Sequence, residues 1–178
     1  MQNEYQKYVK LAIKGNHEAF GELYKIFLSK IYRFIYYLIG DEFLAEDLTQ
    51  NTFLRAWNGL TNFSLNKGTF QSYLYTIARN LVIDSQRKKK IYSLEGLENI
   101  IQSKENQEDE LWKNEKMQKV HEALDGLPED DRQIIILRFF EEMHFDEISN
   151  VIGKESGAIR VKIHRLMLVL RQKLEGKI

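Results

Sequence analysis

The stretch FDEISNVIG at residues 145–153 decides the fold of the C-terminal part of the chain. Its apolar residues recur at helical spacing and form one face, and they are Phe145, Ile148, Val151 and Ile152. Gly153 follows, and glycine commonly ends a helix. Ser156 is of a type that can cap a second helix. The pattern predicts a short helix, a tight turn and a second helix.

The second helix is predicted to bury one stripe of its surface, formed by Ile159, Ile163, Leu166, Leu170 and Leu174. Its opposite face carries Arg160, Val161, His164 and Arg165. A helix that buries one stripe and presents basic side chains opposite to it is suited to the major groove of DNA. For any single amphipathic helix, a solvated basic face is the alternative interpretation. The preceding short helix and glycine turn favour DNA binding.

Charge is balanced overall but separated along the chain. The 178 residues include 26 basic and 26 acidic side chains, which argues against a protein that simply coats nucleic acid. Residues 79–90 hold five basic and one acidic side chain, and residues 154–178 hold seven and two. Residues 91–115 and 125–147 are acidic. We therefore expect phosphate contacts at two separate places.

Several classes of protein are excluded or disfavoured by composition. The chain has no cysteine, so disulfides and thiolate metal sites are excluded. The four histidines do not fall at a paired helical ligand spacing, and we expect neither a metal nor another cofactor. No apolar run approaches the roughly 20 residues of a membrane span, and the N-terminus lacks a signal-peptide pattern. These features predict a cytoplasmic protein without membrane insertion.

The rest of the chain is predicted to be helical, because it has one proline and no long alternating run. Helices are expected at about residues 4–14, from Asn16 to Gly40, at 41–60 and from Thr69 to the basic run at 87–90. The fold class is therefore all-α. Periodicity fades after residue 90, which predicts an N-terminal domain at residues 1–90, an acidic linker at 91–110 and a C-terminal helix-turn-helix domain at 111–178.

Two stretches resemble a single family, in the family's order. Residues 41–57, DEFLAEDLTQNTFLRAW, resemble region 2 of bacterial RNA polymerase sigma factors of the sigma-70 family, in the extracytoplasmic-function (ECF) group, and the similarity continues through residues 70–87. Residues 127–138 and 147–165 resemble region 4 of the same group. The matches cover most of residues 17–90 and 118–174.

The resemblance implies a sigma factor that binds core RNA polymerase, directs it to promoters and promotes DNA opening. It implies a region 2 domain that recognises the minus-ten element and a region 4 domain that recognises the minus-thirty-five element. It also implies that the chain has no catalytic residues, and that promoter DNA, both duplex and melted non-template strand, and an anti-sigma factor are partners. The acidic linker would thread the polymerase RNA exit path, although solvated disorder explains its composition equally well.

A stripe on the predicted helix at residues 41–60 combines acidic, amide and apolar side chains, as a docking surface does. The resemblance implies that this helix binds the clamp of the polymerase's largest subunit through Glu46, Asp47, Gln50, Leu54 and Arg55. On spacing alone, an exposed polar face above buried Phe53 and Trp57 is an equal alternative.

The segment at residues 62–68 and the helix after it carry the groups that stabilise unpaired bases, namely amides, aromatic rings and cations. The resemblance implies capture of a flipped minus-ten base there. The candidate residues are Asn62, Phe63, Asn66, Lys67, Tyr73, Arg79, Asn80, Arg87 and Lys88. Phe70 is also aromatic, but it begins the core stripe of its helix. Tyr73 stands where the family commonly has Trp, so it either packs inward or meets DNA.

In the C-terminal helix, arginine can form forked contacts to guanine or phosphate, and a valine methyl can meet a thymine methyl. The candidate minus-thirty-five residues are Ser156, Arg160, Val161, Lys162, His164 and Arg165.

A LuxR-like regulator that binds operator DNA without polymerase is the alternative function, because it could use the same C-terminal unit. It gives no reason for pairing an amide-rich loop with the basic helix at 79–90. An enzyme is disfavoured, because the sequence has no phosphate-binding glycine loop and no nucleophile with a base.

Overall fold

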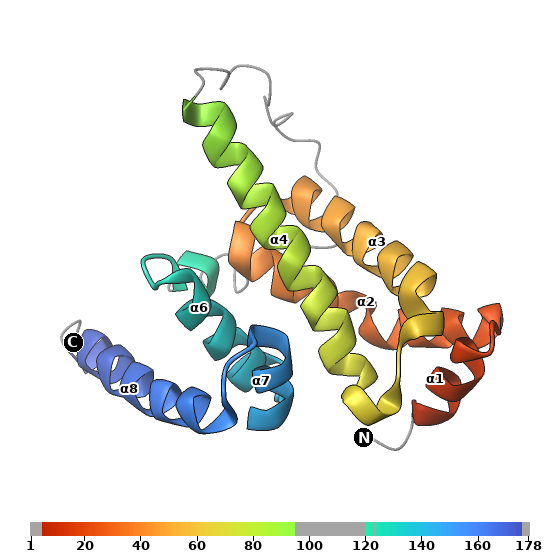
Figure 1. Ribbon diagram of the computed structural model, residues 1–178. Coiled ribbons are helices and arrows are strands. Elements are labelled where there is room, and N and C mark those ends of the chain that lie inside the picture. Colours follow the sequence, from red (N-terminus) through yellow and green to blue (C-terminus); the bar gives the residue numbers. More distant parts are fainter. Residues whose placement is uncertain (1–4, 95–119, 123, 176–178) are drawn as a thin grey trace.

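The computed structural model describes residues 5–94, 120–122 and 124–175, and the regular elements in these ranges are all helical (Figure 1). The predicted all-α fold is confirmed for this part of the chain. The N-terminal elements are α1 (Gln6–Ile13), α2 (His17–Ile39), α3 (Glu42–Gly59), two short 3-10 turns, η1 (Leu60–Asn62) and η2 (Leu65–Lys67), and α4 (Phe70–Leu94). The C-terminal elements are α6 (Glu129–Ile135), a π-helical turn η4 (Ile136–Phe140), α7 (Phe145–Ile152) and α8 (Ser156–Glu175).

The predicted helix starts rest on side-chain caps. The Asn16 carboxamide accepts a hydrogen bond from the backbone N–H of Ala19 at 2.8 Å, and Asp41 accepts one from Leu44 at 3.0 Å. Thr69 Oγ1 accepts from the N–H of Ser72 at 3.1 Å. Each cap satisfies a backbone donor that the first helical turn leaves unpaired, which contributes about 1 kcal/mol. Helix α4 continues through residues 91–94 of the predicted linker, and residues 95–119 lie outside the described part.

The N-terminal core forms where α2 lies against α1, α3 and α4. Helix α2 buries a continuous stripe that comprises Leu23, Phe27, Ile31, Phe34, Ile35 and Leu38. The rings of Phe34 and Tyr75 meet edge to face at 5.1 Å, which joins α2 to α4. Burial of each such side chain contributes about 1.5–3 kcal/mol, so this stripe is the main reason why α2 is a helix in this position.

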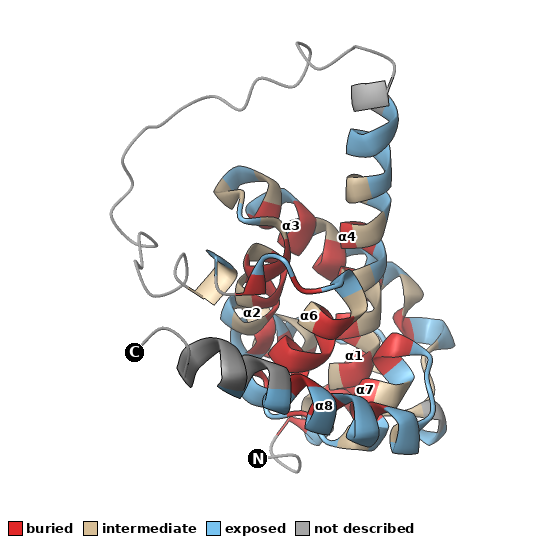
Figure 2. Cartoon of the chain, turned by 90° about the vertical axis from the view of Figure 1, so that its left-hand side faces the viewer, coloured by how far each residue is buried: buried red, intermediate tan, exposed pale blue. Residues whose placement is uncertain are grey.

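The C-terminal helices pack directly on the N-terminal ones. Helix α7 lies against α4, and α6 and η4 lie against α2, while α8 contacts α6 and α7. Buried residues of both halves form one hydrophobic cluster, which is the red centre of Figure 2. The end of α4 projects from this body, and its residues 87–91 are exposed. The two predicted domains therefore share one continuous core in the described structure.

Candidate nucleic-acid interface

The helix-turn-helix predicted at residues 145–175 is present. Helix α7 starts with the N–H of His144 donating to the Glu147 carboxylate at 3.0 Å. It ends at Gly153, whose φ of 74° lies in the left-handed region, and the N–H of Gly153 donates to the carbonyl of Ser149 at 2.8 Å. The Ser149 hydroxyl donates to the carbonyl of Lys154 at 2.6 Å. These bonds fix the turn that sets α8 relative to α7.

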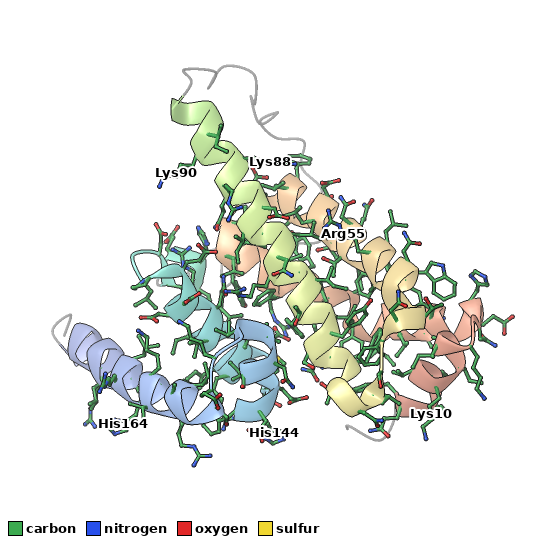
Figure 3. The ribbon with its side chains drawn as sticks, viewed as in Figure 1. Lys10, Arg55, Lys88, Lys90, His144 and His164 are labelled. Atoms are coloured by element: carbon green, nitrogen blue, oxygen red, sulfur yellow. The ribbon has the colours of Figure 1, made fainter. Side chains whose placement is uncertain are left out.

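Helix α8 divides into the two predicted faces. Ile159, Ile163 and Leu166 are buried, and the side chains of Leu170 and Leu174 lie outside the described residues. The candidate DNA-contacting side chains of α8 are exposed except for Ser156, which is half-buried, and the exposed ones are Arg160, Val161, Lys162, His164 and Arg165. Figure 3 shows His164 on the outer side of α8. The sequence periodicity therefore identified the solvent-facing side of this helix.

Acidic residues at the start of α6 pair with two lysines of the helix-turn-helix, one in its turn and one on α8. Lys154 Nζ lies 2.6 Å from Asp130 Oδ2, and Lys162 Nζ lies 2.9 Å from Asp131 Oδ1. The hydrogen bond from Lys154 holds the pKa of the Asp130 carboxyl below its usual range, against a smaller opposing effect of burial. In this arrangement Lys162 is paired within the protein, so a phosphate would have to replace Asp131 as its partner.

Arg160 has a different support, the aromatic ring of Phe145. The guanidinium carbon of Arg160 lies 5.0 Å from the ring centroid, and that of Arg138 lies 4.7 Å from it. Arg138 also donates to the carbonyl of Met143 at 2.9 Å. Both distances are within the range of cation–π attraction. Phe145 thus restrains Arg160 at the start of α8 while leaving its side chain exposed.

A pocket of about 490 Å³ lies beside the predicted base-capture segment. Asn62, Phe63 and Tyr73 line it from the N-terminal half, and Asn150 of α7 lines it from the C-terminal half. Asn62 and Asn66 are exposed, and the side chain of Lys67 lies outside the described residues. The structure therefore brings an amide and two aromatic rings of the predicted set together at one hollow.

Tyr73 packs inward. Its ring centroid lies 4.8 Å from that of Phe63, and its hydroxyl donates to the carbonyl of Ala56 at 3.2 Å. Burial raises the pKa of Tyr73, so the hydroxyl stays protonated at neutral pH. Phe70 is 1% exposed and packs on Phe27 at 5.8 Å, which places it in the core. Of the two alternatives for Tyr73, the structure therefore shows inward packing against Phe63 and α3. The ring also lines one wall of the pocket.

Arg79 lies at the contact between the two halves. Its Nε donates to Gln133 Oε1 at 2.7 Å, and its Nη2 lies 3.3 Å from Asp130 Oδ1. Asn80 is exposed, as are Arg87 and Lys88 near the end of α4. Figure 3 places Lys88 and Lys90 near the projecting end of α4, at the top of the view, and His164 on α8 at the lower left. Of these predicted minus-ten residues of α4, Asn80, Arg87 and Lys88 are therefore exposed to solvent, whereas Arg79 lies in the contact between the two halves.

The candidate polymerase-binding residues share an exposed face of α3, and they are Glu46, Asp47, Gln50, Leu54 and Arg55. The Asn51 side chain donates to the Asp47 carboxylate at 3.2 Å. Leu54 is 59% exposed, whereas Leu48 and Phe53 of the same helix are buried. An exposed leucine among polar groups is the composition expected of a docking face.

Sequence reasoning missed the polar contacts that join the two halves. Arg33 of α2 and Tyr75 of α4 both donate to Glu141, and Thr69 Oγ1 donates to Glu147 at 3.0 Å. Burial raises the pKa of Glu141, although Tyr75 and Arg33 act in the opposite direction. No local signal could have found these pairs, since Arg33 and Glu141 are 108 residues apart.

Within the described residues, no three His, Cys, Asp or Glu side chains gather in a way that could hold a metal ion. No helix in these ranges is long and apolar enough to cross a membrane.

Comparison with known proteins assigns both halves of the chain to one family. The family model described as Sigma-70 region 2 matches residues 23–91, and that described as Sigma-70, region 4 matches residues 117–170. The ECF RNA polymerase sigma factor SigW of Bacillus subtilis is 31% identical, over 95% of this chain and 96% of the relative. The ECF RNA polymerase sigma factor BldN of Streptomyces coelicolor is 31% identical, over 93% of this chain and 64% of the relative.

Solved structures share the fold. CnrH, in a complex with the cytosolic domain of CnrY, superposes with a TM-score of 0.74 at 23% identity, over 96% of this chain and 97% of that chain. The sigma factor RpoE of Bartonella quintana, in a complex with the anti-sigma factor NepR, gives a TM-score of 0.69 at 23% identity, over 88% of this chain and 96% of that chain. The LuxR-like alternative has no support among these matches. Two sigma regions in the expected order, together with SigW-like identity along nearly the whole length, show that the chain belongs to the ECF group of the sigma-70 family of RNA polymerase sigma factors.

Proposed function

We propose that this protein is a dissociable promoter-specificity subunit, which binds core RNA polymerase, directs it to a set of promoters and promotes opening of the DNA. It acts in the cytoplasm and has no catalytic residues of its own. The observation that carries the proposal is the combination of an exposed docking face on α3 with two separate candidate DNA-binding surfaces. The sigma regions that match the two halves support it.

The two halves have different roles in this proposal. Residues 1–90 dock on the polymerase and recognise the minus-ten element, and residues 111–178 recognise the minus-thirty-five element, with residues 91–110 as the connection. Unpaired bases require a hollow with aromatic walls and polar groups, and the pocket beside Asn62, Phe63 and Tyr73 has this composition. A helix with a basic outer face suits the major groove of duplex DNA, and α8 offers such a face.

An anti-sigma factor is the proposed inhibitory partner. Among the solved structures of similar fold, RpoE is bound to the anti-sigma factor NepR, and CnrH is bound to the cytosolic domain of CnrY.

In vitro transcription tests the function. Purified core RNA polymerase is incubated with a genomic promoter library, with and without this protein, and the transcript start sites are mapped. The proposed function predicts a new set of transcript start sites. The DNA upstream of these sites should share two sequence elements at a constant spacing, one near minus thirty-five and one near minus ten. A start-site profile that does not depend on the added protein, together with no co-elution with core polymerase, would contradict it.

A further inference from the structure

One buried carboxylate joins the two halves of the molecule. The side chain of Glu141, which follows η4, is 0% exposed. Its Oε1 accepts hydrogen bonds from Arg33 Nε at 3.0 Å and Nη2 at 2.8 Å, and its Oε2 accepts one from the Tyr75 hydroxyl at 2.6 Å. Arg33 belongs to α2 and Tyr75 to α4, so Glu141 is tied to the two longest N-terminal helices.

This contact exists only while the C-terminal half packs on the N-terminal half, an arrangement that we call closed. A buried carboxylate is tolerated only when cations and donors replace its water, and Arg33 and Tyr75 supply them here. If the C-terminal half moved away, Glu141 and Arg33 would both return to water and the Tyr75 hydroxyl would lose its acceptor. The three side chains are therefore satisfied together, in the closed arrangement, by partners 66 and 108 residues apart.

The same closure covers part of the proposed strand-binding surface. Arg79, a candidate phosphate contact, is bonded to Gln133 and Asp130 of α6. Asn150 of α7 lines the pocket that Asn62 and Tyr73 form, and Thr69 at the edge of this pocket donates to Glu147. A melted strand and the C-terminal half would need the same groups.

We propose that Glu141, Arg33 and Tyr75 form an interdomain latch that holds the chain closed, and that the closed state excludes single-stranded DNA from the pocket beside residues 62–68. This inference rests on the proposed function. Opening of the latch is then a step that must precede strand capture, whichever partner brings it about.

The closed state can be followed by distance measurement, because the chain has no cysteine that would interfere with labelling. Asn58→Cys on α3 and Glu155→Cys beside α8 place dyes at two exposed positions, one in each half. Single-molecule energy transfer on the labelled full-length chain reports the ratio of open to closed molecules. The wild-type background is expected to be mostly closed.

Arg33→Gln is the main variant, because it leaves a carboxylate buried without its cation. We expect the open-to-closed ratio to rise at least about tenfold. Tyr75→Phe is the second variant, since it removes one hydroxyl and keeps the ring in the core against Phe34, and it should shift the ratio in the same direction. Lys25→Gln is the matched control, because Lys25 lies on the same helix but pairs locally with the exposed Glu22.

Two further measurements separate a latch from a general loss of packing. Arg33→Gln combined with Glu141→Gln leaves no buried charge, so closure should return. Acid should also close the Arg33→Gln variant, because protonation neutralises Glu141. The other titratable groups that face Glu141 are Lys30 and Tyr37 on α2 and Tyr75 on α4. Burial raises the pKa of both tyrosines, so neither hydroxyl ionises in the acid range of this measurement.

Binding of a short fluorescent single-stranded oligodeoxynucleotide completes the test. The opened variants should bind it more tightly than Lys25→Gln, by about the factor by which the open fraction rises. Distances that stay unchanged in Arg33→Gln and Tyr75→Phe would overturn the latch, and opening without tighter strand binding would overturn the exclusion. Neither measurement contains polymerase, so a chain that opens as expected and yet directs no transcription would contradict the proposed function alone.

Discussion

At the scale of single residues, Phe145 is the side chain on which the proposed duplex-reading face depends. The centroid of its ring lies 4.7 Å from the guanidinium carbon of Arg138 and 5.0 Å from that of Arg160. It is the first residue of α7, so it joins the turn before that helix to the start of α8. An arginine held against a ring loses less freedom when it contacts a base than an unsupported one does.

We predict that Phe145→Ala weakens binding to a duplex minus-thirty-five site about two- to fivefold, because cation–π support of an exposed arginine is worth about 0.5–1 kcal/mol. Phe145→Tyr keeps a ring and should bind as the unsubstituted chain does. Fluorescence anisotropy with a selected upstream duplex measures both. Equal affinities for the alanine and tyrosine variants would show that the ring does not support Arg160.

Two carboxylates give opposite pH dependences. Burial raises the pKa of Glu141, so its folded pKa lies above the unfolded value of about 4.3. The proton that Glu141 retains in the folded state therefore adds stability at low pH, and this addition is lost as the pH rises through the folded pKa. The ion pair with Arg33 and the hydrogen bond from Tyr75 remain at higher pH. The hydrogen bond from Lys154 lowers the pKa of Asp130, so the Asp130 contribution is present above about pH 4 and is lost as the pH falls.

Urea unfolding between about pH 3 and pH 8 tests these signs. The free energy of unfolding of the unsubstituted chain minus that of Glu141→Gln should fall as the pH rises. The free energy of unfolding of the unsubstituted chain minus that of Asp130→Asn should rise as the pH rises. Parallel slopes for the two variants would show that the environments of these carboxylates are not those described.

At the scale of elements, periodicity and caps were enough to predict most of the helices. The stripes of α2 and α8 and the caps at Asn16, Asp41 and Thr69 lie where the sequence indicated. These features depend on neighbours three or four residues away, so a sequence displays them directly. The turn between α7 and α8 is equally local, because Gly153 alone accounts for its left-handed backbone.

We predict that Gly153→Ala destabilises the fold by about 1–2 kcal/mol, because alanine is strained at a φ of 74°. A Cβ at Gly153 would meet no atom within 4 Å, so backbone strain is the whole effect. Gly157→Ala is the matched control, since Gly157 lies within α8 with equally open surroundings, and alanine there should stabilise by about 0.5–1 kcal/mol. Thermal unfolding of the two variants should therefore give shifts of opposite sign.

Helix α3 carries the proposed docking face, and its substitution should separate polymerase binding from DNA preference. Asp47→Ala combined with Gln50→Ala is expected to lower affinity for core polymerase about tenfold or more, as loss of contacts at an interface centre does. Both side chains are exposed, so the thermal midpoint should stay within about 1–2 °C. Promoter choice at saturating protein should be unchanged. Unaltered co-purification with core polymerase would exclude this face.

At the scale of the whole molecule, the two candidate DNA surfaces lie at different places, and we propose that they bind different forms of DNA. The exposed face of α8 carries Arg160 and Arg165. Asn80 lies on α4, and the pocket is lined mainly by residues of the N-terminal half, together with Asn150 of α7. Figure 3 shows the projecting end of α4 and the outer side of α8 well apart. The proposed function therefore has a promoter bound as duplex at one surface and opened at the other.

Substitutions in the two halves should affect different steps of initiation. Arg160→Ala and Arg165→Ala should each weaken formation of the closed promoter complex by about 1–3 kcal/mol. Asn80→Ala and Asn62→Ala should leave that step nearly unchanged and reduce the permanganate reactivity of thymines in the opened region. The reverse pattern in footprinting would overturn the assignment of the two halves.

The sequence by itself determined that the chain is helical, where the helices begin and which faces of α2, α3 and α8 are buried or exposed. It did not determine how the halves meet, because a buried stripe reports only that a face is covered and not what covers it. The tertiary structure alone decided that Arg79 contacts α6, that Asn150 lines the pocket and that Glu141 joins α2 and α4. These contacts depend on partners far apart in the chain, and the geometry of the packed core brings them together.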